Sequence, residues 1–107
     1  MTEAADLLRT AADRIEALAA RTTPGEWRGA GLLATRPEVV AHAPDGGTEH
    51  VAEARASSAA WIVAFSPAIA GPLVAWLRTA ADADPIEPAA LAVAQDLLDR
   101  LTAPRPA

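Results

Sequence analysis

Apolar residues near the start of the chain recur with the spacing of an α-helix. Over residues 3–21 they fall at i, i+4, i+8 and i+11, which places them on one helical face. Thr2 is the predicted N-cap, and acidic residues follow it in the first turn. The predicted buried face consists of Leu7, Ala11, Ile15 and Leu18.

A turn and a short strand are predicted after this helix. Pro24 and Gly25 have the chemistry of a type II turn, in which proline presets φ and glycine accepts a positive φ. The turn leads to Trp27, which we expect to pack between a sheet and the helices. Its replacement by alanine should then cost about 3–5 kcal/mol. Residues 27–33 contain two glycines and are predicted as a strand with a glycine bulge, with a loop as the alternative.

Residues 37–54 have the pattern of a β-hairpin around the turn sequence Pro-Asp-Gly-Gly. Pairing Ala43 with Thr48 sets Val40 opposite Val51 and His42 opposite Glu49. A bulge near the turn is the alternative, and it would set His42 opposite His50. In the first register the predicted buried face consists of Val39, Ala41, His50, Ala52 and Ala54.

Residues 59–76 form the most apolar stretch of the chain and contain Trp61, Phe65 and Trp76. This stretch is predicted to be the buried helical core. Pro67 suits the first turn of a second helix, whereas Pro72 is expected to kink that helix or to mark a new start after Gly71. Ser57 or Ser58 is the predicted N-cap of the first of these helices.

The last helix is predicted over residues 88–102, and residues 103–107 are expected to be a disordered tail. The predicted fold class is α+β: an N-terminal helix, a small antiparallel sheet of two or three strands, and two or three C-terminal helices. Residues 1–102 are expected to form a single domain, because 107 residues suffice for one core.

The net charge of −5 argues against nucleic-acid binding, which requires a basic face. The chain has no cysteine, so disulfides and thiolate ligands are excluded. The N-terminal residues are acidic where a signal peptide is basic, and no apolar run of membrane-spanning length is free of proline. We therefore expect a cytoplasmic protein with no membrane partner.

No catalytic residue, metal site or cofactor is predicted. A metal site would need His42 and His50 to converge with acidic neighbours, which occurs only in the bulged register. The serines at 57, 58 and 66 lie in no nucleophile elbow, and the glycines form no phosphate loop.

Two weaker sets of candidate residues remain. Arginines bind phosphate bidentately and tryptophan stacks on bases, so residues around the sheet are candidates for binding a ligand. These are Trp27, Arg28, Arg36, His42, His50 and Arg55. Apolar residues on the later helices are candidates for an oligomer interface, namely Ile69, Leu73, Trp76, Leu77, Leu91 and Leu98.

Four short blocks resemble a group of small uncharacterised proteins from high-GC Gram-positive bacteria and their phages. The blocks are TTPGEW at 22–27, SAAWIVAFSP at 58–67, LVAWL at 73–77 and ALAVA at 90–94. The usual forms are TPGPW, an aromatic-Ile-Ala segment ending in His-Pro, VADWL and ALAVA. The first two are also similar, more distantly, to the Ead family of phage early proteins. Here Glu26, Ser66 and Ala75 replace the usual proline, histidine and aspartate.

The resemblance implies a phage or mobile-element context and carries no catalytic residue. We expect a non-enzymatic accessory protein that acts by protein–protein interaction or self-association, as a homodimer or with a host protein. The alternative is a protein that binds or sequesters a small nucleotide signal in a phage-defence conflict.

Overall fold

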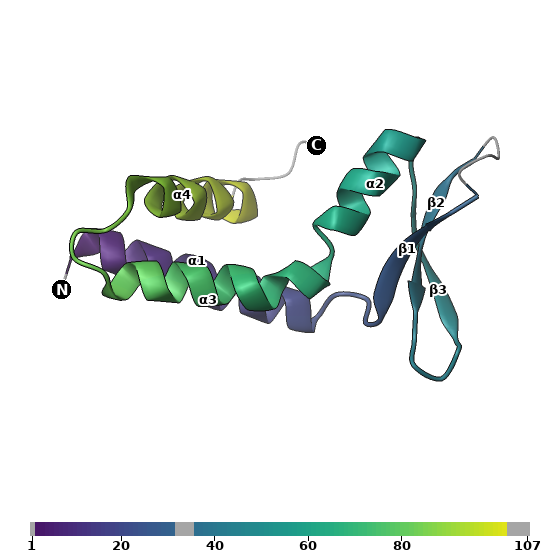
Figure 1. Ribbon diagram of the computed structural model, residues 1–107, viewed down its shortest axis with the longest axis horizontal. Helices are drawn as coiled ribbons and strands as arrows, with labels where there is room; N and C mark the ends of the chain where they lie inside the picture. The colour runs from purple at the N-terminus through teal and green to yellow at the C-terminus, as the bar shows by residue number, and fades with distance from the viewer. Residues whose placement is uncertain (1, 32–35, 103–107) are drawn as a thin grey trace. The chain divides into compact units, whose positions relative to one another are not determined.

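The computed structural model describes residues 2–31 and 36–102 and confirms the α+β class. The chain divides into two compact units. The helical unit comprises Met1–Leu18 and Gly71–Ala107, and the sheet unit comprises Ala19–Ala70. Figure 1 gives the element labels. The predicted tail at 103–107, and residues 32 and 33 of the predicted first strand, lie outside the described residues.

The helical unit is built from α1 (Glu3–Ala20), α3 (Ala70–Asp82) and α4 (Pro88–Thr102). The predicted N-cap of α1 is confirmed, since the Ala5 amide donates a hydrogen bond of 3.1 Å to Thr2 Oγ1. The bounds predicted for the last helix are also confirmed. Pro88 is its first residue, a position at which the missing amide proton costs nothing.

Small side chains dominate the core of the helical unit. Leu8 and Leu77 are its largest fully buried residues, and most of the others are alanines. The predicted buried face of α1 is only partly right, because the buried stripe runs through Leu8 and Ala12, whereas Leu18 is 42% exposed. The reason is that alanine allows close approach of neighbouring helices, so the core centres on alanine-rich positions. These are Ala5, Ala11, Ala12, Ala80, Ala81, Ala90 and Ala94.

The sheet unit contains three antiparallel strands in the order β1 (Glu26–Ala30), β2 (Glu38–His42) and β3 (Thr48–Glu53). The helix α2 (Ala56–Ala64) packs on β1 and β2, and the short 3₁₀ helix η1 (Pro67–Ile69) follows it. Val39 and Ala41 alternate on β2 and are buried together with Ala59 of α2.

The predicted hairpin register is correct on one side of a bulge and wrong on the other. Val39 pairs with Ala52 as predicted, but Val40 pairs with His50 and His42 with Thr48. The irregularity lies between Val39 and Val40 and leaves Val51 as the extra residue of β3. It turns His50 to the same face as Val40, so the histidine is exposed instead of buried.

The starts of the later helices differ in part from expectation. Neither Ser57 nor Ser58 is the N-cap of α2, because the helix begins at Ala56 and Arg55 occupies the cap position. The reason is that β3 leads into α2 through only two residues. Pro67 is at the start of η1 as predicted, and Pro72 lies in the first turn of α3, where proline does not disturb the helix.

Candidate protein-interaction surface

The side chains of Trp61 on α2 and of Phe65 at its C-cap form an exposed aromatic pair. They are one helical turn apart, and their rings stack with centroids 4.6 Å apart and an interplanar angle of 29°. Trp61 is 67% exposed and Phe65 is 57% exposed. The prediction that this stretch is buried core is therefore wrong for both residues.

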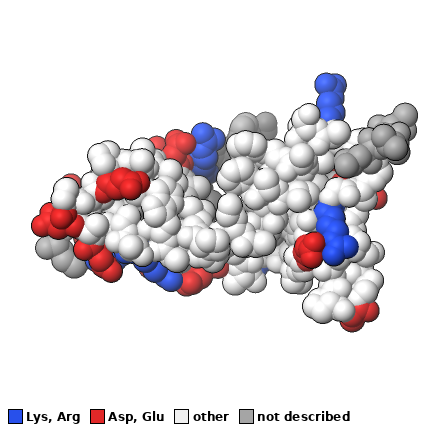
Figure 2. Space-filling view, in the orientation of Figure 1, with Lys and Arg blue, Asp and Glu red and all other residues white. Residues whose placement is uncertain are grey.

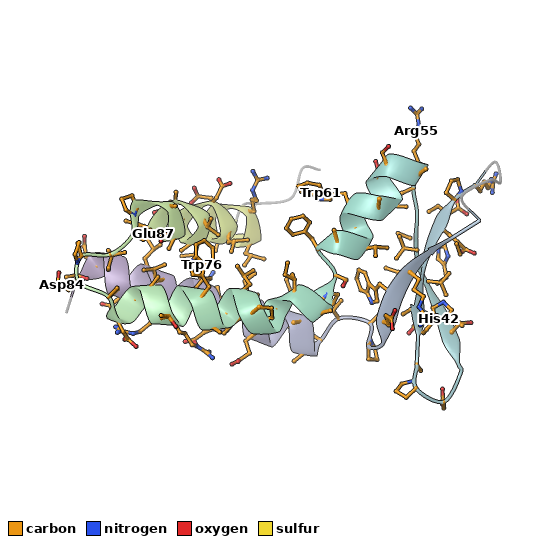
Figure 3. All side chains as sticks on the ribbon, viewed as in Figure 1. His42, Arg55, Trp61, Trp76, Asp84 and Glu87 are labelled. Atoms are coloured by element: carbon orange, nitrogen blue, oxygen red, sulfur yellow. The ribbon has the colours of Figure 1, made fainter. Side chains whose placement is uncertain are left out.

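The physical reason is the direction in which α2 faces the sheet. Ala59 is fully buried, and Ile62 and Val63 are partly buried, so this side of α2 covers the strands. Trp61 projects from the side of α2 away from the strands (Figure 3). A helix this apolar on every side is normally buried all round. The outer side of α2 is instead left uncovered.

The outer side of α2 is also uncharged. No charged residue occurs in the sequence between Arg55 and Arg78. Figure 2 shows the part of α2 that faces the viewer without charged side chains, although Arg55 projects from its end. We define the α2 surface by six of its exposed residues, Ala56, Ser57, Ala60, Trp61, Ala64 and Phe65.

The segment Ala56–Asp82 is also long enough to cross a membrane, and its most apolar 18-residue window has a mean hydropathy of 1.7. Only 22% of its most apolar window is buried. One such segment is weak evidence for a membrane protein, and here the segment is divided among α2, η1 and α3.

The predicted oligomer-interface residues have different surroundings. Ile69 and Trp76 are exposed, which keeps them available to a partner. Leu73, Leu91 and Leu98 are partly buried against the core of the helical unit. Leu77 is fully buried in that core, so its assignment to an interface is wrong: no part of its side chain is left for another chain to contact.

The predicted ligand-binding residues fall on opposite faces of the sheet. Trp27 shares the inner face with buried Ala41, and its indole N–H donates a hydrogen bond of 3.0 Å to the Thr23 carbonyl. Arg28 is on the outer face, where it binds the Glu26 carboxylate at 2.9 Å. This pair lowers the pKa of Glu26 and raises the pKa of Arg28, because each partner stabilises the charge of the other.

The two histidines share the outer face but form no metal site. His50 Nδ1 is 2.7 Å from Glu38 Oε2, whereas His42 pairs along the strands with Glu26 and Thr48. Within residues 2–31 and 36–102, no group of three or more potential ligands is close enough to hold a metal ion.

The remaining two arginines of the set, Arg36 and Arg55, are exposed. Arg55 lies at the end of α2, far from His42 at the other end of the sheet unit (Figure 3). The predicted ligand-binding set therefore forms no common site.

An open pocket of about 550 Å³ lies in the helical unit, and none of the predicted residues lines it. The Arg9 guanidinium in its wall is already bound to Asp82 at 2.8 Å, so it offers little positive charge to a ligand. The loop between α3 and α4 supplies Asp84, Pro85 and Ile86 to the pocket.

Comparisons with models of protein families, with curated proteins and with solved structures gave no match for this chain. The candidate surface therefore rests on the geometry of α2 alone. The sequence does contain a signal for it, since α2 lacks a polar side: residues 59–65 are all apolar. That pattern predicts a buried helix, whereas exposure of one side agrees with it equally well.

Proposed function

We propose that this chain is a non-enzymatic accessory protein that binds another protein chain through the α2 surface. The observation that carries the proposal is the stacked pair Trp61 and Phe65, 67% and 57% exposed on an uncharged helix. Large aromatic side chains cost free energy when they remain in water, so an exposed pair is a typical feature of a binding surface.

The pair is well suited to binding because it is ordered before a partner arrives. Stacking limits the rotamers of both rings, which reduces the conformational entropy lost on association. The exposed parts of the two side chains amount to roughly 300 Å² on the scale of 150–250 Å² for an aromatic residue. Tryptophan at the centre of a contact is also the residue most often found to dominate binding energy.

The resemblance to small phage and mobile-element proteins supports an accessory role in that setting. The binding of a nucleotide signal finds less support. Of the six residues suggested for it, Trp27 lies on the inner face of the sheet and donates its indole N–H to the Thr23 carbonyl. Arg28 and His50 each contact a carboxylate.

The test is photo-cross-linking in a high-GC Gram-positive host, with the full chain carrying a photoreactive amino acid at position 57 of the α2 surface, followed by affinity capture and mass spectrometry. The wild type is compared with the double variant W61S/F65S and with W76S as a control. Trp76 is exposed but lies on α3. We expect cross-links from α2 to another chain in the wild type and in W76S, and their loss in the double variant. Cross-links that persist in the double variant would contradict the proposal.

A further inference from the structure

We infer that the partner of the α2 surface is a second copy of this chain, bound about a two-fold axis. This inference rests on the proposed function, since it names the occupant of the same surface. Two observations carry it, the arrangement of large and small residues on α2 and the distribution of charge, and the size of the patch sets the expected strength.

The α2 surface carries a ridge and a groove side by side. Residues four apart align along a helix, so Ser57, Trp61 and Phe65 form one row. The neighbouring row consists of alanines only: Ala56, Ala60 and Ala64. All six residues are exposed. Helices pack by placing the ridge of one into the groove of the other.

A surface that has both a ridge and a groove is complementary to a second copy of itself. In a two-fold contact the same residues of both copies meet, so the aromatic row of each copy occupies the alanine row of the other. An unrelated partner would need only the aromatic row, or a pocket to receive it. The alanine row beside it is the feature that suits a second copy.

The charge distribution favours the same contact. The helical unit exposes carboxylates such as Asp13, Glu16 and Asp96, and the outer face of the sheet exposes Glu26. Two copies of a chain with a net charge of −5 repel each other when such faces meet. The α2 surface contains no charge, so copies approach there without placing carboxylates against carboxylates. The same net charge opposes binding to an anionic lipid surface.

The size of the patch sets the expected strength. Roughly 300 Å² of aromatic surface per copy is well below the approximately 800 Å² that each partner contributes to a stable complex. The alanine row and the ends of α2 add to this area without reaching it. We therefore expect a reversible dimer that forms in the micromolar range.

The two-fold geometry places the middle of α2 beside its own counterpart. Ala60 is central among the exposed residues 56–65, so two copies of Ala60 should lie close to the axis. The natural chain has no cysteine, which makes single cysteine variants unambiguous reporters. A60C should form a covalent dimer on mild oxidation or with a short bismaleimide. A75C on α3 and A92C on α4 are exposed controls and should remain monomeric.

Sedimentation velocity of the full chain, from low micromolar to several hundred micromolar, measures the association itself. We expect W61E to abolish the dimer, and A60L to weaken it at least tenfold because leucine fills the groove. W76E is the matched control, with the same substitution on α3, and should dimerise like the wild type. Circular dichroism and thermal unfolding show that each variant is folded.

A chain that stays monomeric at all concentrations overturns the inference, as does a dimer that survives W61E or is lost in W76E. The cross-linking experiment then shows whether the proposed function fails together with the dimer. If cross-links to a different chain are still lost in W61S/F65S, the α2 surface binds another protein and only the second copy is wrong. If no such cross-links exist either, both proposals fail. A monomer that floats with phosphatidylcholine–phosphatidylserine vesicles through Trp61 would assign the surface to lipid and overturn both.

Discussion

Arg78 of α3 holds the Glu16 carboxylate of α1 with two hydrogen bonds of 3.1 Å, one from each terminal nitrogen of its guanidinium. The two residues are separated by 62 positions in the sequence. Arg78 also binds Asp13 Oδ1 at 2.9 Å. A single arginine therefore fastens two turns of α1 to α3 at the surface of the helical unit.

We predict that R78Q makes the helical unit less stable at neutral pH and removes part of its pH dependence. Hydrogen bonding and charge from Arg78 lower the pKa of Glu16 below its ordinary value of 4.5. A lowered pKa in the folded state stabilises the protein fully above 4.5, and this stabilisation is lost as the pH falls through the lowered value. Melting temperatures measured from neutral to acidic pH should therefore fall less steeply in R78Q.

R100Q is the control for this prediction. Arg100 pairs with Asp96 at 3.4 Å on the exposed side of α4, where an ion pair contributes little. Its removal should leave the pH dependence as in the wild type. A pH profile of R78Q parallel to that of the wild type would show that the Arg78 contacts do not stabilise the folded state.

We predict opposite outcomes for Leu77, which the sequence alone placed at an oligomer interface, and Trp61, which it placed in the core. L77A should lower the free energy of unfolding by about 2–5 kcal/mol, because Leu77 is fully buried and its loss leaves a cavity. W61A should change it by no more than about 0.5 kcal/mol, because most of the Trp61 side chain is already in water. Urea denaturation of dilute protein measures both, and a large loss in W61A would place Trp61 in the core.

We predict that G25A destabilises the sheet unit by about 1–3 kcal/mol or more. Gly25 has φ +105°, and an added Cβ would lie 2.7 Å from the His42 carbonyl oxygen of β2. G46A is the matched control, since Gly46 has φ +90° but no atom within 4 Å of an added Cβ. Thermal unfolding should show a larger loss for G25A than for G46A. Equal losses would mean that backbone strain alone acts at Gly25.

We predict that Trp27 contributes to the free energy of unfolding both through its hydrogen bond and through the packing of its ring. W27F removes the indole donor to the Thr23 carbonyl and should cost about 0.5–1.5 kcal/mol. W27A also removes the ring from the inner face of the sheet, and we expect the total to reach about 3 kcal/mol. Chemical denaturation of both variants checks this. A W27A protein as stable as W27F would show that the ring contributes no packing.

The elements of this fold were largely predictable, because they depend on local signals. Proline at position 88 marks the start of α4, and Thr2 in front of an amphipathic run marks the start of α1. The sequence did not predict in which direction the bulge at Val51 shifts β3 along β2. A shift in either direction leaves the valine and alanine of β2 facing inward. A single residue there decides whether His50 is buried or exposed.

The candidate surface was the largest error, and its cause is equally physical. Hydropathy describes how strongly a segment avoids water, but it does not say which side of a short helix has a neighbour. The sheet covers α2 along Ala59, Ile62 and Val63, so the two large aromatic side chains are the ones left outside.

The order of the two units along the chain has a consequence for synthesis on the ribosome. The sheet unit is one uninterrupted piece, Ala19–Ala70, whereas the helical unit joins Met1–Leu18 to Gly71–Ala107. The first helix therefore leaves the exit tunnel long before the helices that shield Leu8 and Ala12 have been translated. The hairpin and α2 contact only residues of the sheet unit, so this unit is fully translated before α1 has the helices that it packs against.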